Sequence, residues 1–220
     1  MEYWENVQKS LETKGYFLSD GVDVSALKES FARLPLDPFI EGDYRFRRLS
    51  RFVSPAGRLR ALPHAEFVQS DQYNLLLGNI RREYEEMEAS VALNDGFINL
   101  ISYIQEHLKS TGETSVFGAH QIRITAEEDS KGEPAPEGIH KDGFDYVVIT
   151  CVDRLGVEGG KTELYESLDS SPVFSEIIKP NQILFVDDKK LFHYTTNVEN
   201  INKADAYRDV IVVTVKCEVS

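Results

Sequence analysis

The spacing of apolar residues along this 220-residue chain changes near its middle. In the first half, apolar side chains recur every three or four positions, which is the period of an amphipathic helix. Asp23 and Asn94 are suited to cap such helices, Thr111-Gly112 is suited to end one, and residues 15–18 have the character of a short strand. The pattern predicts helices over residues 3–12, 23–34, 74–90 and 94–112.

Beyond residue 113 the apolar residues are β-branched or aromatic, and they fall in short runs separated by turn-forming residues. Short strands with no helices between them are typical of a sandwich or barrel. We therefore expect a single α+β domain over residues 1–220, with a mainly helical part (1–112) that buttresses a β core (113–220). The strands are expected over residues 116–125, 146–152, 162–167, 183–186 and 210–215.

Composition and charge limit the partners that this protein can have. The hydrophobic content of 41% is ordinary for a globular chain, and the formal net charge of −13 argues against nucleic acid or an anionic membrane as the main partner. The two cysteines, Cys151 and Cys217, lie in strand-like runs, which indicates buried, reduced thiols. We see neither a signal peptide nor an apolar run of membrane-spanning length, so we expect a cytoplasmic protein that binds a small molecule. Its oligomeric state is left open.

The most informative motif is His140-Lys141-Asp142, followed downstream by His193. In an extended segment, alternate side chains point to the same face, so His140 and Asp142 can bind one metal ion. His193 lies in a second strand-like run and can supply a third ligand from a facing strand. Two imidazoles and a carboxylate suit Fe(II) with open coordination positions, although Mn(II) and Zn(II) would accept the same ligands.

Arg208 begins an apolar strand 15 residues after His193. A buried guanidinium needs a partner, and a planar carboxylate held by two hydrogen bonds fits it best. The alternative is an arginine that reaches solvent at a sheet edge or pairs with an acidic side chain. Together with the three candidate ligands, Arg208 indicates a site for an acidic co-substrate.

These motifs resemble one family in order along the chain. His120-Gln121-Ile122-Arg123 and Pro136-Glu137-Gly138-Ile139-His140-Lys141-Asp142-Gly143 are similar to segments of the Fe(II)/2-oxoglutarate dioxygenases of the L-isoleucine 4-hydroxylase type. The likeness continues through Gly159-Gly160-Lys161-Thr162, Val186-Asp187-Asp188, His193 and Tyr207-Arg208-Asp209. It extends more weakly to Tyr44-Arg45-Phe46-Arg47-Arg48 and Gln72-Tyr73-Asn74, so it covers most of the chain.

The resemblance implies a double-stranded β-helix core of the jelly-roll or cupin-like kind. It also implies that His140, Asp142 and His193 bind Fe(II) and that Arg208 binds the distal carboxylate of 2-oxoglutarate. Enzymes of this type use O₂ and 2-oxoglutarate to hydroxylate a free aliphatic L-amino acid, or to oxidise a thioether side chain, with release of succinate and CO₂. Two alternatives remain open: a cupin-like metalloenzyme that does not use 2-oxoglutarate, and a non-catalytic barrel that binds a metabolite.

Several further residues are candidates with competing interpretations. Gln121 and Arg123 share one face of a strand, and Arg123 can hold a substrate carboxylate or form a surface ion pair. Phe144 and Tyr73 are candidates for substrate contact, and Phe144 can equally belong to the core. Thr162 is a candidate for a hydroxyl beside the co-substrate, or it is simply a β-branched strand residue.

Other polar residues are expected to have supporting roles. His120 is interpreted as a hydrogen-bonded structural histidine. Asp187 and Asp188 are expected to form a turn or to contact a metal ligand rather than the metal. The basic cluster of Arg45, Arg47, Arg48 and Arg51 either attracts anionic substrates or forms a solvated surface.

Overall fold

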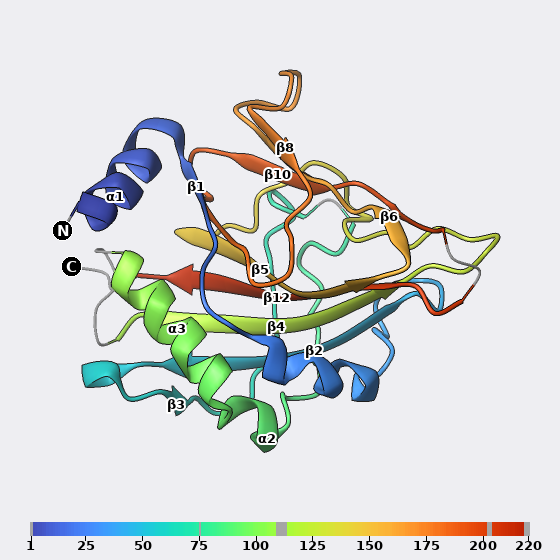
Figure 1. The fold of residues 1–220 in the computed structure, drawn as a ribbon, viewed down its shortest axis with the longest axis horizontal. Helices are drawn as coiled ribbons and strands as arrows, with labels where there is room; N and C mark the ends of the chain where they lie inside the picture. Colours follow the sequence, from blue (N-terminus) through green and yellow to red (C-terminus); the bar gives the residue numbers. More distant parts are fainter. Residues whose placement is uncertain (1, 75, 109–113, 202–203, 218–220) are drawn as a thin grey trace.

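The computed structural model describes residues 2–74, 76–108, 114–201 and 204–217, with the side chains of residues 2–6 left out. Its main element is a seven-stranded antiparallel sheet with the strand order β1-β9-β5-β12-β4-β2-β3 (Figure 1). These strands are β1 (Tyr16–Ser19), β2 (Arg45–Val53), β3 (Arg60–Ala61), β4 (Val116–Thr125), β5 (Tyr146–Leu155), β9 (Ile183–Asp187) and β12 (Tyr207–Lys216).

Five short strands form two smaller antiparallel sheets. One has the order β10-β7-β8, and the other pairs β11 with β6. Their bounds are β6 (Val157–Gly159), β7 (Thr162–Tyr165), β8 (Phe174–Glu176), β10 (Phe192–Thr195) and β11 (Val198–Asn200).

The large sheet has one face toward the smaller sheets, and the helices pack on its other face. Figure 1 shows α3 crossing this second face. Their bounds are α1 (Glu2–Lys14), α2 (Ala89–Ala92), α3 (Asp95–His107), and the 3₁₀ helices η1 (Ser25–Arg33) and η2 (Pro55–Gly57). Side chains of α3 and η1 join those of β4, β5, β9 and β12 in one buried apolar cluster. None of the helices in the described ranges combines the length and apolar character that a bilayer crossing requires.

Strand alternation separates the two faces of the large sheet. On β12, Ile211 and Val213 pack against the helices, whereas Val210 and Val212 face the smaller sheets. On β4, Phe117 and Ala119 likewise belong to the helix-side core. The space between the large sheet and the smaller sheets is therefore lined by alternate residues of the same strands.

The strands predicted in the second half, and the strand at residues 15–18, are confirmed with small shifts at their ends. The predicted helix over residues 74–90 is wrong, because only its last two residues, which begin α2 (Ala89–Ala92), are helical among those that the structure describes. Arg82 and Tyr84 are buried while Glu83 and Glu85 are exposed, which is the alternation of an extended segment. Arg82 of this segment lines the pocket, and Glu85 accepts a backbone hydrogen bond from Leu49 on β2. These tertiary contacts override the helical preference that the spacing of its apolar residues indicates.

Two further expectations about the N-terminal part need correction. The segment after Asp23 forms the 3₁₀ helix η1 rather than an α-helix, and Asp23 accepts a hydrogen bond from the backbone N–H of Ser25 (2.9 Å). The first half also contributes β2, which pairs with β4 in the large sheet, so it does more than buttress the core from outside. The fourth helix is α3, and its predicted end at Thr111-Gly112 lies outside the described residues.

The interface between α3 and the sheet gives a stability prediction. Leu100 on α3 is fully buried (0% exposed) in the apolar cluster. We expect Leu100→Ala to lower the free energy of unfolding by about 2–5 kcal/mol, through lost transfer energy and an unfilled cavity. Urea denaturation measures this change, and Leu93→Ala, at a site 75% exposed, is the matched control with an expected change within about 0.5 kcal/mol. Equal effects of the two substitutions would contradict this description of the core.

Candidate active site

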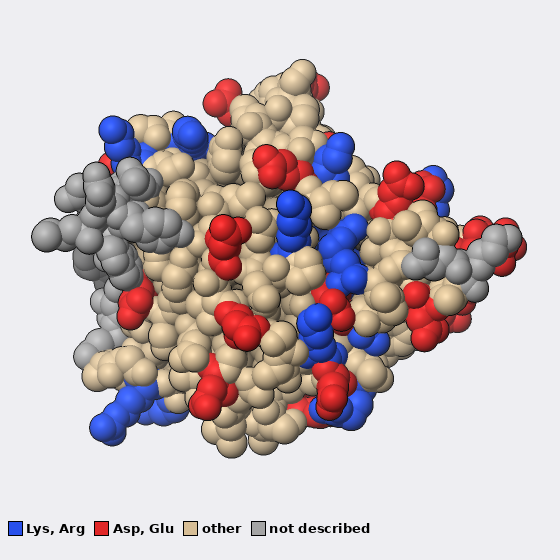
Figure 2. All heavy atoms as spheres, in the orientation of Figure 1, with Lys and Arg blue, Asp and Glu red and all other residues tan. Residues whose placement is uncertain are grey.

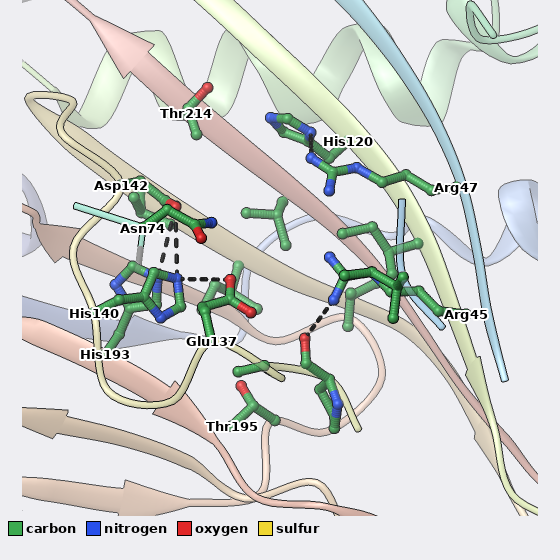
Figure 3. A pocket seen from close by; sticks show the side chains of 18 of the residues that line it. Arg45, Arg47, Asn74, His120, Glu137, His140, Asp142, His193, Thr195 and Thr214 are labelled. Atoms are coloured by element: carbon green, nitrogen blue, oxygen red, sulfur yellow. Dashed lines mark hydrogen bonds and ion pairs between the residues drawn. The ribbon is translucent and has the colours of Figure 1, made fainter. Parts of the chain in front are cut away.

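The backbone itself brings His140 and His193 together. Each residue donates its N–H to the carbonyl oxygen of the other (3.1 and 2.8 Å), which forms an isolated antiparallel bridge between the segment before β5 and strand β10. Asp142 follows two residues after His140, and its two carboxylate oxygens lie 3.6 Å from the Nε2 atoms of the two histidines. The three candidate ligand atoms all lie within 4.8 Å of one another. The facing-strand arrangement expected for His193 is therefore present (Figure 3).

The hydrogen bonds of these residues fit a metal ion. The Nδ1–H of His140 donates to the carbonyl oxygen of Gly138 (2.8 Å), so Nε2 is the ring nitrogen that faces Asp142 and that would bind a metal ion in place of a proton. Ligands about 2.1 Å from one ion lie roughly 3 Å apart when they are cis, so a small contraction would place all three on one metal. The donor set of two imidazoles and one carboxylate suits Fe(II).

The electrostatics also favour a cation here. Burial lowers the pKa of His140, but Asp142 and Glu137 outweigh burial and raise the pKa to about 9. The Oε1 atom of Glu137 lies 3.2 Å from His140 Nε2, with 14% of its side chain exposed. The two carboxylates that raise this pKa would also attract a divalent metal ion.

Asp188 fixes the segment that carries Asp142. Its carboxylate accepts hydrogen bonds from the backbone N–H groups of Asp142 (3.0 Å), Gly143 (2.7 Å) and Phe144 (2.9 Å). Its Oδ1 atom also lies 3.7 Å from His193 Nδ1. Burial and the charge of Asp142 raise the pKa of Asp188 to about 6. Asp188 thus supports two candidate ligands from behind, as expected, rather than offering a second carboxylate to the metal.

Removal of this support gives a prediction about metal affinity. We expect Asp188→Ala to weaken Mn(II) binding by about 10- to 100-fold, because residues that orient metal ligands typically have effects of this size. Calorimetric titration with Mn(II) measures the change. Asp187→Ala is the matched control, since Asp187 only caps the turn at Lys189 and Lys190 and pairs with Lys190. If the Asp188 variant binds Mn(II) with wild-type affinity, the segment from Asp142 to Phe144 keeps its geometry without the Asp188 carboxylate, and the prediction is wrong.

Arg208 lies in the same pocket as the three candidate ligands. It is 3% exposed, and its Nε and Nη2 atoms have no hydrogen-bond partner among the described residues. Burial lowers its pKa to about 10, so the guanidinium is still charged at neutral pH. The adjacent Asp209 points to the other face and pairs with Arg123. The buried guanidinium of Arg208 therefore has N–H donors that could bind both oxygens of one carboxylate, as the distal carboxylate of 2-oxoglutarate would require.

Thr162 lies near this end of the pocket without lining it. It is fully buried (0% exposed), and its hydroxyl has no partner among the described residues. On the paired strand β10 it lies opposite Thr195, which does line the pocket. Its role beside the co-substrate stays a prediction.

The structure places Gln121 and Arg123, the two residues of β4 that were predicted to bind substrate, outside the pocket lining. Both lie on the face of β4 that is turned away from the pocket, whereas His120, Ile122 and Ile124 line it. Gln121 donates to the hydroxyl of Ser30 on η1 (2.7 Å). Arg123 makes two hydrogen bonds to Asp209 (2.7 Å each) and lies over the ring of Tyr207. The alternation of the strand places these side chains outside, and the ion-pair interpretation of Arg123 is correct.

Phe144 and Tyr73 lie beside the pocket rather than in its lining. The Phe144 ring is parallel to that of Phe67, a lining residue, at a centroid distance of 6.3 Å. The Tyr73 ring packs over Gly143, where a Cβ atom would come within 2.6 Å of it. Gly143 also has a φ of +83°, so this close approach next to Asp142 requires glycine. Substrate contact by Phe144 or Tyr73 stays a prediction.

The sequence motifs did not identify all of the polar lining residues. The basic cluster divides by strand alternation, because Arg45 and Arg47 point into the pocket while Arg48 points out and pairs with Glu85 (2.8 Å). Figure 3 shows Arg45 and Arg47 reaching from β2 toward the side of the pocket opposite the triad. The sequence signal that could have identified Arg45 and Arg47 as a pair on one face is their spacing of two residues in a strand. Polar lining residues to which the sequence analysis assigned no site role include Gln69, Arg82 and Glu137.

Comparisons with known proteins agree with this geometry. The model of the 2OG-Fe dioxygenase family matches residues 28–214. A bsmA homologue from Methylobium petroleophilum PM1 has a TM-score of 0.86 at 24% identity, over 97% of this chain and 93% of that chain. The structure of IDO from Bacillus thuringiensis has a TM-score of 0.80 at 19% identity, over 98% of this chain and 100% of that chain.

A third solved structure, the Fe(II)/α-ketoglutarate-dependent dioxygenase TqaL, has a TM-score of 0.70 at 16% identity, over 100% of this chain and 88% of that chain. At these identities the likeness establishes a shared fold, and the expected double-stranded β-helix is confirmed. No curated protein sequence matches the chain.

Proposed function

Because this chain belongs to the 2OG-Fe dioxygenase family, whose members use Fe(II), 2-oxoglutarate and O₂, we propose that it hydroxylates a free L-amino acid with an aliphatic side chain. The products would be the hydroxylated amino acid, succinate and CO₂. The observation that carries the substrate assignment is the presence of unassigned charges of both signs in the pocket. Glu137 lies beside the triad, and Arg47 and Arg82 also line the pocket.

Each residue of the site has a proposed task. His140, Asp142 and His193 hold Fe(II), which supplies the oxidising chemistry with O₂ and 2-oxoglutarate when it is bound. Arg208 holds the distal carboxylate of 2-oxoglutarate, and Thr162 offers a hydroxyl at the same end. The apolar side chains between the sheets exclude water from the reacting centre.

A zwitterion matches the charges that remain after these assignments. A carboxylate needs buried cationic donors, and an ammonium group needs an acceptor such as Glu137. The rest of the lining is largely aliphatic and includes Ile40, Leu77, Ile122 and Ile124. An aliphatic amino acid can therefore present both charged groups and still bury its side chain.

A substrate screen tests the proposal. The purified protein, with Fe(II), ascorbate and 2-oxoglutarate, is incubated with each common L-amino acid, and succinate is measured beside product mass. We expect at least one aliphatic amino acid to release succinate and to gain about 16 Da, the mass of one oxygen atom. Product formed without 2-oxoglutarate would instead favour a cupin-like metalloenzyme. If no compound in a broad panel of small molecules releases succinate or gains mass, a non-catalytic binding barrel would be favoured.

A further inference from the structure

The pocket contains more positive charge than the chemistry assigned so far requires. Although the chain carries a net charge of −13, four arginines line this one cavity: Arg45, Arg47, Arg82 and Arg208. All four arginines are buried, whereas acidic and basic side chains are interspersed on the outer face seen in Figure 2. Buried guanidinium groups are costly unless an anion accompanies them.

Two of the four arginines are already accounted for, one by an acidic side chain and one by the proposed co-substrate. Arg45 pairs with the buried carboxylate of Asp37 (3.2 Å) and donates to the carbonyl oxygen of Pro134 (2.8 Å). Arg208 is assigned to 2-oxoglutarate. Arg47 and Arg82 remain, and among the described residues neither forms an ion pair with a carboxylate.

Arg47 and Arg82 are held in place by uncharged groups. Arg47 contacts Nδ1 of His120 and donates to the Tyr84 hydroxyl (3.3 Å), and Arg82 donates to Oε1 of Gln69 (2.7 Å). Both guanidinium groups also lie over the ring of Phe67, at 5.6 and 4.7 Å from its centroid. These contacts orient the two cations side by side without neutralising either of them.

The same residues present donors that are not used. Arg47 and Arg82 are 7% and 2% exposed, and the Nε atom of each has no partner in the described part of the chain. The Nε2 atom of His120, a neighbour of Arg47 in the pocket, is also buried without a partner. Several unsatisfied donors around two fixed cations are the features of an anion subsite.

We propose that Arg47 and Arg82 form the subsite that binds the carboxylate of the primary substrate, which is therefore a carboxylic acid. This assignment replaces Arg123, which lies outside the pocket, and it deepens the proposed function on which it rests. The subsite is linked to the metal site, because Gln69 accepts from Arg82 and donates to the Oδ1 atom of Asp142 (2.7 Å). A substrate held there by its carboxylate would have the rest of its chain within reach of the triad.

Matched substrates test the subsite. For each aliphatic amino acid, turnover is compared with that of its carboxamide and its deaminated acid, which for L-valine are L-valinamide and isovalerate. We expect the wild-type KM to rise roughly 10- to 100-fold from acid to amide, the usual effect of losing hydrogen bonds to a charged group. Arg47→Met and Arg82→Met should raise KM for the acid by a similar factor and leave KM for the amide nearly unchanged.

The ratio of the two KM values is measured within one protein, so a loss of folded enzyme does not alter it. Arg48→Met is the matched control: Arg48 is the next residue on β2, points out of the pocket, and should leave the ratio as it is in the wild type. The KM for 2-oxoglutarate should change less than about twofold in either pocket variant, because Arg208 is intact. Equal increases for acid and amide would mean a structural role and would overturn the proposal.

The outcomes separate this inference from the proposed function. If only deaminated acids are turned over, the amino-acid assignment fails and the carboxylate subsite stands. If neutral compounds are the better substrates, the subsite is refuted. If nothing is turned over, calorimetry decides: isovalerate should bind the wild type in the presence of Mn(II) and 2-oxoglutarate and should not bind the Arg47→Met/Arg82→Met double variant. An absence of binding to the wild type would also refute the subsite.

Discussion

Substitution of Asp142 by alanine is expected to weaken Mn(II) binding by more than about 100-fold and to reduce succinate release to background, an effect larger than that of removing a residue that only orients the ligands. Among the described residues, Asp142 alone places carboxylate oxygens beside both imidazoles, 3.6 Å from each Nε2 atom. Its removal leaves two neutral ligands, which hold a hard divalent ion poorly. The same substitution removes the hydrogen bond from Gln69.

Titration with Mn(II), followed by electron paramagnetic resonance of the free ion, measures this effect without any need for turnover. Asp169→Ala, at an exposed position outside the pocket, is the control and should bind Mn(II) like the wild type. If the Asp142 variant keeps wild-type affinity, Glu137 is the metal ligand instead, because its carboxylate is the other one beside His140. The assignment of the triad would then be wrong.

The fold was predictable wherever the sequence has one clear period. The runs over residues 116–125 and 146–152 are strands because their apolar residues alternate between two buried faces. The segment over 74–90 misled the prediction, since its apolar residues also fit a helix. Its backbone instead makes a turn at residues 76–79 and is then extended, with the backbone of Arg82 hydrogen-bonded to that of Phe67 and the carbonyl oxygen of Glu85 hydrogen-bonded to the N–H of Leu49. Such long-range contacts leave no mark on local spacing.

The candidate site was predictable to a similar degree. The spacing of His140 and Asp142, followed by His193 and Arg208, indicated residues that the fold does bring into one pocket. The sequence did not show which face of a strand points into the pocket, because alternation divides the side chains into two sets and does not distinguish between them. On β4 the wrong choice selected Gln121 and Arg123, and on β2 the cluster could not be divided until the pairing with β4 was known.

Substitution of Arg208 by methionine is expected to weaken 2-oxoglutarate binding by roughly 30- to 4,000-fold, which corresponds to about 2–5 kcal/mol for loss of one partner of a buried charge pair. Two of its guanidinium nitrogens are buried without partners among the described residues, and no carboxylate of the described residues pairs with it, so an external carboxylate would supply the missing acceptors. Methionine keeps much of the apolar stem that packs against Gly160 and removes the charge.

Calorimetric titration of the Mn(II)-loaded protein with 2-oxoglutarate measures this loss directly. Arg154→Met is the matched control, because Arg154 lies opposite Arg208 in the β5–β12 register but is bonded to the carbonyl oxygen of Gly159 outside the pocket lining. Arg208→Lys should recover only part of the affinity, since an ammonium group cannot form the two parallel hydrogen bonds of a guanidinium. Unchanged 2-oxoglutarate affinity in Arg208→Met would separate this arginine from the co-substrate and shift that role to the cationic pair Arg47 and Arg82. Because the Mn(II) titration of the same variant should match the wild type, a loss of 2-oxoglutarate binding can be assigned to the carboxylate contact rather than to the metal site.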